Sequence, residues 1–581
     1  KATIMTIDAT TQANVQAWLE GAYDDATKQA IREMQQHNPE ELNESFYRNL
    51  EFGTGGLRGI MGVGTNRMNK YTVAMATQGL ANYVKKCFPE EKELRAAISH
   101  DSRNHSREFA EITAHVLAAN GFRVFLFEEL RPTPELSFAV RHFECHTGVM
   151  LTASHNPKEY NGYKAYWNDG CQLTAPHDTN VIDEVLKITD LKDVRMSGGE
   201  ANITLVGEEV DAAFLRHIEA NSLHPELIKK HHDLKIVYTP LHGTGITMIP
   251  RALKMLGFTN VNIVEAQATP DGNFPTTPSP NPEERAAMKM AVELAQEIDA
   301  DIVFASDPDA DRVGVAVKRP NGEWMLLNGN QTFSVLMYYL TKQWKAEGRL
   351  QGKEYVVSTI VTSELPVAIA ESCGIEAYKV LTGFKFIGSK IREQEQQKTF
   401  IMGGEESYGY MIGDFVRDKD AVGACCMIAE MAAWAAEQGK TFFDVLTDIY
   451  KEYGFYKEGL HNVVRKGKSG AEEIQEMMRQ FRANPPAEIA GSKVVRINDY
   501  QTHESRDLAT GATTLLDLPK SNVLQYFCED GSKVTVRPSG TEPKIKFYFS
   551  VKASLGCGCQ FDSVNQSLDA KIESIKQSLN L

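Results

Sequence analysis

The sequence has no Cys-x-x-Cys pair, no long apolar run and no excess of positive charge. Neither Cys425-Cys426 nor Cys557-Gly558-Cys559 has clustered histidines that would complete a zinc site. We therefore expect the nine cysteines to be buried or incidental thiols, which favours a reducing compartment. The most apolar run, residues 424–436, is about a dozen residues long and contains Glu430, so it predicts a core helix instead of a membrane span.

The net charge is −15, from 62 Lys and Arg against 77 Asp and Glu. This balance disfavours nucleic acid and anionic membrane surfaces as partners, but local arginines still allow an anionic small substrate. The first residues show no signal-peptide pattern. We expect a cytoplasmic enzyme of several domains, since 581 residues are too many for one core. We also expect it to be a monomer or a weak homodimer.

One strand–helix–strand unit, with a glycine that ends the helix, occurs three times in the chain. The first copy runs from residues 95–99 to 124–127, the second from 234–238 to 261–264, and the third from 355–357 to 377–380. In each copy a further strand then ends in a polar loop, at residues 152–157, 307–312 and 404–409. This order predicts βαβ units with parallel strands, and three similar domains that face one cleft.

After about residue 465 the pattern changes to an antiparallel meander over residues 523–528, 533–537 and 544–551, followed by a helix at 562–579. The predicted fold is α/β: three tandem similar α/β domains with mixed sheets plus a C-terminal α+β domain, around a central cleft. We place the domains at residues 1–223, which include an N-terminal helical arm, and at 224–329, 330–465 and 466–581.

Three aspartates, Asp307, Asp309 and Asp311, alternate along one loop. In an extended chain they project to the same side and offer hard oxygens to one divalent cation. An EF-hand begins in the same way, but its sixth position is Arg312 here and its twelfth is Lys318, which excludes it. A solvated acidic turn is the alternative, although apolar strands on both sides tether the loop to a core. Magnesium is favoured because it binds few carboxylates together with phosphate oxygens.

Ser154 and His155 follow a short apolar strand and precede the Asn156-Pro157 turn, where an α/β protein displays reactive groups. The chain has no G-x-S-x-G elbow, and a histidine adjacent in sequence rarely has the geometry of a base for its neighbour. A serine hydrolase is therefore disfavoured. The combination of this serine with the three aspartates and a candidate phosphate-binding loop at residues 537–541 points to phosphoryl transfer instead. Arg312, next to the predicted metal site, could steady a phosphoryl oxygen.

Three further loops carry weaker signals. Residues 537–541 (Arg-Pro-Ser-Gly-Thr) combine a guanidinium, two hydroxyls and glycine-freed amides, which suit a phosphate dianion, with a plain hairpin turn as the alternative. Residues 404–407 (Gly-Glu-Glu-Ser) offer a carboxylate and a hydroxyl suited to sugar hydroxyls, and an exposed acidic turn fits them equally well. Residues 382–385 (Thr-Gly-Phe-Lys) contribute only a basic residue on a loop.

These loops, in this order, resemble those of the α-D-phosphohexomutase superfamily over essentially the whole chain from about residue 50. Residues 152–157 are similar to the phosphoserine loop of that superfamily, 307–312 to its metal loop, 404–407 to its sugar loop and 537–541 to its phosphate loop. The resemblance implies a four-domain enzyme with a central cleft. It also implies a phosphorylated Ser154 and Mg²⁺ held by Asp307, Asp309, Asp311 and the seryl phosphate.

The same resemblance assigns roles to further residues. Arg58, His155 and Lys164 match positions around the transferring group, with His155 and Lys164 as the candidates for general acid and base. Arg312 joins them as a candidate through its place beside the aspartates. The residues implied in binding the sugar and its second phosphate are Thr382, Gly383, Lys385, Glu405, Ser407, Lys419, Arg537, Ser539, Gly540 and Thr541.

The implied reaction interconverts glucose 1-phosphate and glucose 6-phosphate through glucose 1,6-bisphosphate, which also serves as activator. The sugar loop Glu-Glu-Ser-Tyr-Gly, with residues 383–388 and 417–420, looks like the phosphoglucomutase-2/phosphopentomutase branch. A pentose or mannose phosphate turned over by the same mechanism is therefore an alternative. A non-catalytic phosphosugar-binding protein and a simple phosphatase are the rivals from other classes.

Overall fold

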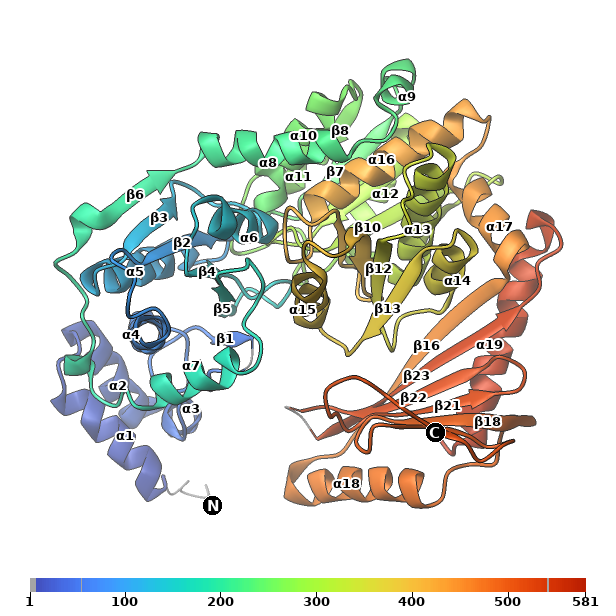
Figure 1. Cartoon of the computed structure of the whole chain (residues 1–581). Coiled ribbons are helices and arrows are strands. Elements are labelled where there is room, and N and C mark those ends of the chain that lie inside the picture. Colours follow the sequence, from blue (N-terminus) through green and yellow to red (C-terminus); the bar gives the residue numbers. More distant parts are fainter. Residues whose placement is uncertain (1–6, 54, 541–542) are drawn as a thin grey trace. The chain divides into compact units, whose positions relative to one another are not determined.

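The structure is a computed structural model that describes residues 7–53, 55–540 and 543–581 (Figure 1). These residues form two compact units. The first unit combines the chain up to residue 328 with Phe384–Gln438, and the second combines Gly329–Gly383 with Gly439–Leu581. Among the described residues, no helix is both long enough and apolar enough to span a membrane.

The predicted N-terminal arm is a group of three helices, each begun by a side chain that caps its first turn. Asp8, Asp24 and Asn38 accept hydrogen bonds from backbone N–H groups of the first turns, which would otherwise lack partners. Trp18 packs edge-on against Tyr71, which fastens the arm to the first α/β domain. The helices are α1 (Ala9–Glu20), α2 (Asp25–His37) and α3 (Pro39–Phe46).

The first α/β domain is built on a mixed sheet in the order β1-β5-β4-β2-β3-β6. Strands β2, β3, β4 and β6 run parallel, and β5 is antiparallel to both of its neighbours. The strands are β1 (Gly56–Ile60), β2 (Arg95–His100), β3 (Arg123–Phe127), β4 (Thr147–Leu151), β5 (Tyr160–Trp167) and β6 (Ile203–Val206). The helices are α4 (Lys70–Cys87), α5 (Ser106–Ala119), α6 (Thr133–His142), α7 (His177–Leu186), α8 (Glu208–Asn221) and α9 (Pro225–Lys230).

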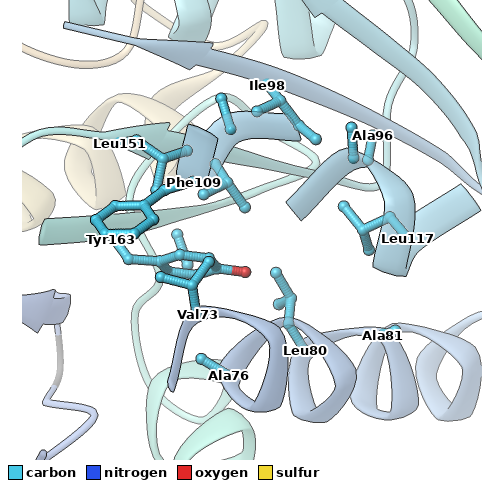
Figure 2. Close-up of a cluster of buried hydrophobic side chains, with 14 of the residues drawn as sticks. Val73, Ala76, Leu80, Ala81, Ala96, Ile98, Phe109, Leu117, Leu151 and Tyr163 are labelled. Carbon is cyan, nitrogen blue, oxygen red and sulfur yellow. The ribbon is translucent and has the colours of Figure 1, made fainter. Parts of the chain in front are cut away.

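Alternating strand residues give this sheet one apolar face that α4 and α5 cover (Figure 2). Ile98 and Leu151 come from neighbouring strands, and Val73 and Leu80 meet them from α4 at helical spacing. Helix α6 covers the opposite face, where Gly148 leaves room for its side chains. Strand β4 lies between these two buried layers, and the Ser154 loop begins directly after its carboxyl end at Leu151.

The second repeat has the predicted arrangement, in the order β11-β10-β9-β7-β8. Strands β7, β8 and β9 are parallel, and β10 and β11 return antiparallel. The elements are β7 (Ile236–Thr239), α10 (Ile249–Leu256), β8 (Val261–Ile263), α11 (Glu265–Ala268), α12 (Arg285–Ile298), β9 (Ile302–Ser306), β10 (Val313–Lys318) and β11 (Trp324–Leu327). The aspartate loop thus joins a parallel strand to its antiparallel neighbour, as the Ser154 loop does in the first domain.

The third repeat contributes elements to both units. In the second unit, β12 (Glu354–Thr359) and β13 (Glu376–Val380) are parallel around α14 (Leu365–Ser372), near α13 (Gly329–Ala346) and α17 (Phe442–Tyr453). In the first unit lie α15 (Phe384–Gln394), β14 (Thr399–Gly404), β15 (Tyr410–Ile412) and α16 (Ala421–Glu437). Helix α16 is the predicted core helix, and nearly all of its residues are buried.

The glycines predicted to end the helix in each repeat have the left-handed conformation that favours glycine. The φ angles are 88° at Gly121, 115° at Gly257 and 75° at Gly374. This local agreement supports the interpretation of the three segments as copies of one unit.

The C-terminal sheet has the order β16-β23-β22-β21-β18-β19-β20, with β17 paired to β18. The predicted antiparallel meander is confirmed as β21, β22 and β23. The sequence did not predict the other strands of this sheet, β16 to β20. Helices α18 and α19 pack on this sheet (Figure 1). The elements are β16 (Phe455–Val464), α18 (Gly467–Ala483), β17 (Glu488–Ile489), β18 (Ser492–Asp499), β19 (Glu504–Asp507), β20 (Thr513–Leu515), β21 (Leu524–Cys528), β22 (Lys533–Pro538), β23 (Lys544–Ala553) and α19 (Phe561–Ser578).

The expectation that every cysteine is an unpaired thiol is wrong at two positions. Cys557 and Cys559 form a disulfide just before α19, and the other seven cysteines are free. The short spacing of the pair was interpreted as incidental because it fits no common zinc pattern.

Candidate active site

The Ser154 loop leaves β4 and turns sharply at the serine. Ser154 is buried, and its φ of 55° lies in the left-handed region, which is unfavourable for a residue with a Cβ. Its backbone N–H donates to Thr152 Oγ1 at 2.9 Å, and Thr152 Oγ1 donates to Asp101 Oδ2 at 2.7 Å. This chain of hydrogen bonds fixes the position of the Ser154 hydroxyl.

The aspartate loop between β9 and β10 brings its three carboxylates together. One oxygen from each of Asp307, Asp309 and Asp311 lies within 4.8 Å of the others, and all three residues are buried. The backbone N–H of Asp311 donates to Asp307 Oδ1 at 3.1 Å, which closes the loop on itself. Ser154 Oγ donates to Asp307 Oδ2 at 3.1 Å. The two loops predicted from sequence therefore meet in the first unit.

The carboxylate group has the properties of a cation site. Asp309 Oδ1 and Asp311 Oδ1 are buried and have no hydrogen-bond partner. Burial, together with the charges of Asp311 and Asp309, raises the pKa of Asp307 well above its ordinary value. Three carboxylates in so small a volume repel one another, so a divalent cation bound between them would stabilise all three.

Two lysines flank the carboxylates. Lys164 on β5 places Nζ 3.1 Å from Asp309 Oδ2 and 3.4 Å from Asp311 Oδ2. Burial alone would lower the pKa of Lys164, but the two carboxylates outweigh burial and raise it, so the side chain stays charged. Lys419 Nζ lies 3.6 Å from Asp311 Oδ2 and 3.6 Å from Asp418 Oδ1. Both lysines are thus held beside the buried carboxylates of the aspartate loop.

His155 is uncharged at neutral pH. Its Nδ1 lies 3.2 Å from Ser154 Oγ, and burial, followed by the charges of Arg312 and Arg58, lowers its pKa to about 3. Arg58 lies on β1 opposite Gly162 and interacts electrostatically with the aspartate loop. Arg312 Nη1 donates to Glu283 at 3.1 Å. A neutral imidazole surrounded by cations suits a site that receives a phosphoryl group.

The loop at residues 404–409 is tied to the aspartate loop. The backbone N–H of Val313, the first residue of β10, donates to Tyr408 O at 3.0 Å. Ser407 Oγ and Glu405 Oε2 are 3.5 Å apart, so a hydroxyl and a carboxylate are presented together. Lys385 lies in the same unit, with Nζ 3.7 Å from Asp178 Oδ2.

Several predicted substrate contacts belong to the second unit. Arg537 at the end of β22 donates from Nη2 to Tyr548 Oη at 3.1 Å, and its Nε is buried without a partner. The hairpin after β22 is closed by the backbone bond from Ser539 N to Lys544 O at 2.8 Å. Thr382, Gly383 and Gly540 also belong to this unit, and Thr541 lies outside the described residues.

The structure adds three residues to the site that the sequence interpretation missed. Asp101 and Arg103 lie beneath the Ser154 loop. Thr133, the first residue of α6, donates from Oγ1 to Asp309 Oδ2 at 2.7 Å and from its backbone N–H to Asp309 O at 2.9 Å. The Asp-x-Arg spacing after β2 could have drawn attention to the first two, but nothing in the sequence marks their partners in the Ser154 loop or points to Thr133.

Comparison with known proteins supports the same picture. Family profiles described as phosphoglucomutase/phosphomannomutase, alpha/beta/alpha domains I, II and III match residues 49–192, 212–322 and 328–453. A phosphoglucomutase from Staphylococcus aureus (strain MRSA252) is 39% identical over 96% of this chain and 98% of its own length.

Two solved structures have a similar fold. Parafusin (phosphoglucomutase) from Paramecium, in its open form, is 17% identical with a TM-score of 0.69, over 91% of this chain and 96% of that chain. A phosphoglucomutase/phosphomannomutase family protein from Burkholderia thailandensis is 17% identical with a TM-score of 0.65, over 92% and 98%. From the matched profiles and the extent of the sequence identity, this chain belongs to the phosphoglucomutase/phosphomannomutase family.

Proposed function

We propose that this protein is a phosphosugar mutase that interconverts glucose 1-phosphate and glucose 6-phosphate through a phosphorylated Ser154 and a glucose 1,6-bisphosphate intermediate. The observation that carries the proposal is the 3.1 Å contact between Ser154 Oγ and Asp307, at a buried group of three carboxylates. The named activity of the Staphylococcus relative, at 39% identity, supports glucose as the sugar.

Asp307, Asp309, Asp311 and the phosphate on Ser154 would hold Mg²⁺. The unpartnered oxygens of Asp309 and Asp311 fit this ion, since Mg²⁺ prefers carboxylate and phosphate oxygens. When bound, Mg²⁺ supplies positive charge that offsets the charge of the phosphoryl group during transfer.

In the first half-reaction, the bond between Ser154 Oγ and phosphorus breaks while phosphorus bonds to the free hydroxyl of a sugar monophosphate. The net result moves one proton from that hydroxyl to Ser154 Oγ. His155, whose Nδ1 lies 3.2 Å from Oγ, and Lys164 are the two candidates to exchange this proton. Lys164, held in its charged form, stabilises the oxygens on which negative charge increases. The second half-reaction reverses these steps at the other end of the sugar.

The residues proposed to bind the sugar are different from those proposed to transfer the phosphoryl group. Glu405 and Ser407 present a carboxylate and a hydroxyl to the ring hydroxyls, with Lys385 and Lys419 from the same unit. The second phosphate is assigned to Arg537, Ser539, Gly540 and Thr541, with Thr382 and Gly383 as further contacts. The Arg537 guanidinium, whose Nε has no hydrogen-bond partner among the described residues, can bind a phosphate group on either end of the sugar. The reaction requires this, because each phosphate of the bisphosphate occupies the second site in turn. A cytoplasmic location and a monomer or weak homodimer remain predictions.

The Ser154→Ala variant tests the function. We expect the wild type with Mg²⁺ and a trace of glucose 1,6-bisphosphate to convert glucose 1-phosphate, with almost no release of inorganic phosphate. Ser154→Ala should lose at least about 10³-fold in kcat, because the acceptor oxygen is gone. A variant that retains the wild-type rate refutes the phosphoserine mechanism.

A panel of substrates tests the sugar. Glucose, mannose, ribose and deoxyribose 1-phosphates should be compared by kcat/KM under the same conditions. We expect glucose 1-phosphate to be preferred, and a preference for a pentose or mannose phosphate would assign the protein to a different branch of the family. Release of phosphate in proportion to substrate consumed would instead indicate a phosphatase.

A further inference from the structure

We propose that Arg103 is a positioning residue for phosphoryl transfer, which holds the Ser154 loop in the one conformation that presents Oγ to the carboxylates. The inference rests on the proposed function, because it explains how the acceptor serine of that reaction is held in place. Arg103 is followed by Asn104 in the turn between β2 and α5, and the sequence interpretation did not single it out.

The guanidinium of Arg103 binds four backbone carbonyls of the loop. Nη2 donates to Ser154 O at 2.8 Å and to Asn156 O at 2.6 Å. Nη1 donates to Pro157 O at 2.9 Å and to Tyr160 O at 3.1 Å. One side chain therefore fixes the loop from the reactive serine to the first residue of β5.

Beneath the loop, the Arg103 guanidinium forms a direct ion pair with the Asp101 carboxylate. Arg103 Nε lies 3.2 Å from Asp101 Oδ2, and both side chains are 0% exposed. Asp101 Oδ2 also accepts from Thr152 Oγ1 at 2.7 Å, and Asp101 Oδ1 accepts from Ser106 Oγ at 2.6 Å. The same ion pair thus holds the residues before Ser154 through Asp101 and the residues after it through Arg103.

The guanidinium also contacts the second domain. Its carbon lies 5.2 Å from the centre of the Phe274 ring. The segment that carries Phe274 is tied to His242 by the bond from Asp271 N to His242 O. Close to His242, Thr244 donates from its backbone N–H to Pro308 O at 2.8 Å, inside the aspartate loop. Arg103 therefore lies between the residues that hold the Ser154 loop and the residues that hold the aspartate loop.

The loop needs such a clamp for two reasons. Ser154 has a left-handed backbone that its own sequence does not favour, so contacts from outside the loop must hold it. Carbonyl oxygens accept but do not donate, and only a guanidinium offers enough donors in one plane to bind four of them. A lysine at this position would keep the charge beside Asp101 but could not span the four carbonyls.

The test compares Arg103→Ala and Arg103→Lys with the wild type and with Arg123→Ala. Arg123 is an exposed arginine on β3, the strand that pairs with β2 in the same domain, and serves as the matched control. We measure kcat and KM for glucose 1-phosphate, phosphorylation of Ser154 by intact mass, and the melting temperature of each variant. Each assay is repeated with added guanidinium chloride at concentrations that leave the wild-type rate unchanged.

We expect kcat of Arg103→Ala to fall about 100-fold, the cost of a displaced reacting atom. KM should stay within about threefold of the wild type, because the sugar and phosphate contacts lie elsewhere. Guanidinium should restore Arg103→Ala by about tenfold or more, and should not affect Arg103→Lys, whose ammonium occupies the site. Arg103→Lys keeps the charge that Asp101 needs, so it remains informative if the alanine variant does not fold.

The proposal is overturned if Arg103→Lys keeps kcat within about threefold of the wild type. It is also overturned if folded Arg103→Ala loses activity that guanidinium does not restore, because a general loss of stability would then explain the defect. Absence of mutase activity in the wild type would refute the proposed function itself, which separates the failure of the two proposals.

Discussion

Thr133→Val removes one hydrogen bond to a proposed Mg²⁺ ligand while conserving the shape of the side chain. Thr133 Oγ1 donates to Asp309 Oδ2 at 2.7 Å in a fully buried position. Its backbone N–H, which donates to Asp309 O at 2.9 Å, is not changed by the substitution. The variant therefore keeps the loop attached to α6 but loses the contact that orients the carboxylate.

The expected size of the effect follows from the type of bond. A hydrogen bond to a charged group contributes about 1.5–3 kcal/mol, and Asp309 Oδ2 keeps Lys164 Nζ at 3.1 Å as a second partner. Loss of a residue that orients a metal ligand typically costs about 10- to 100-fold in metal affinity or activity. We therefore expect the Mg²⁺ concentration for half-maximal mutase rate to rise about tenfold or more, with a smaller change of the rate at saturating Mg²⁺.

The assay measures mutase rate against free Mg²⁺, with the melting temperature recorded with and without Mg²⁺. Thr113→Val is the matched control, because Thr113 is also buried in this domain but donates only to Phe109 O in its own helix. The control should lose some stability and keep the wild-type Mg²⁺ dependence. If Thr133→Val shows the same half-saturation as the wild type, Thr133 does not orient a metal ligand and the reasoning is refuted.

Two further predictions concern stability and the support of the aspartate loop. Burial raises the pKa of Glu458 to about 7, although Ser363 and Lys533 act in the opposite direction. Between pH 4.5, the ordinary pKa of this carboxyl group, and pH 7, the folded chain therefore keeps a proton that the unfolded chain loses. This contribution to stability should be complete below pH 4.5 and decline by up to about 3 kcal/mol as the pH rises through 7. Glu458→Gln should flatten the melting temperature over this range, and parallel curves for variant and wild type would contradict the assignment. Gly243→Ala should lower kcat at least about tenfold, because its Cβ would lie 2.5 Å from Pro308 Cα and displace the aspartate loop; an unchanged kcat would show that the loop accommodates the methyl group.

The contact between the serine and aspartate loops was predictable because each loop follows the same strand of a repeated unit. The carboxyl ends of equivalent strands carry the reactive groups, so Ser154 and Asp307 were expected to meet. The three aspartates were likewise expected to lie together, because they occupy alternate positions of one loop. The sequence pattern carries these features because they depend on side-chain type and position in a strand.

Other parts of the site were not predictable for physical reasons. Arg103 binds backbone carbonyls, which every residue has, so no pattern of side chains marks its partners. Thr133 meets Asp309 across 176 positions, a contact that depends on how two domains pack. Strand β16 was missed because it lies at the edge of its sheet and only its first residue, Phe455, is buried. Its pairing with β23 relies on backbone hydrogen bonds, which leave no mark in the sequence.

The most direct test of the account is to follow the phosphoryl group itself. The purified protein is phosphorylated with glucose 1,6-bisphosphate labelled in its phosphates, the label is mapped by peptide mass spectrometry, and the phosphoenzyme is then mixed with unlabelled glucose 1-phosphate in one turnover. We predict a single labelled site at Ser154, from which the label passes to the sugar bisphosphate at a rate no slower than kcat. Label at another residue, or label on Ser154 that leaves only as inorganic phosphate, would contradict the claim that Ser154 carries the transferred group.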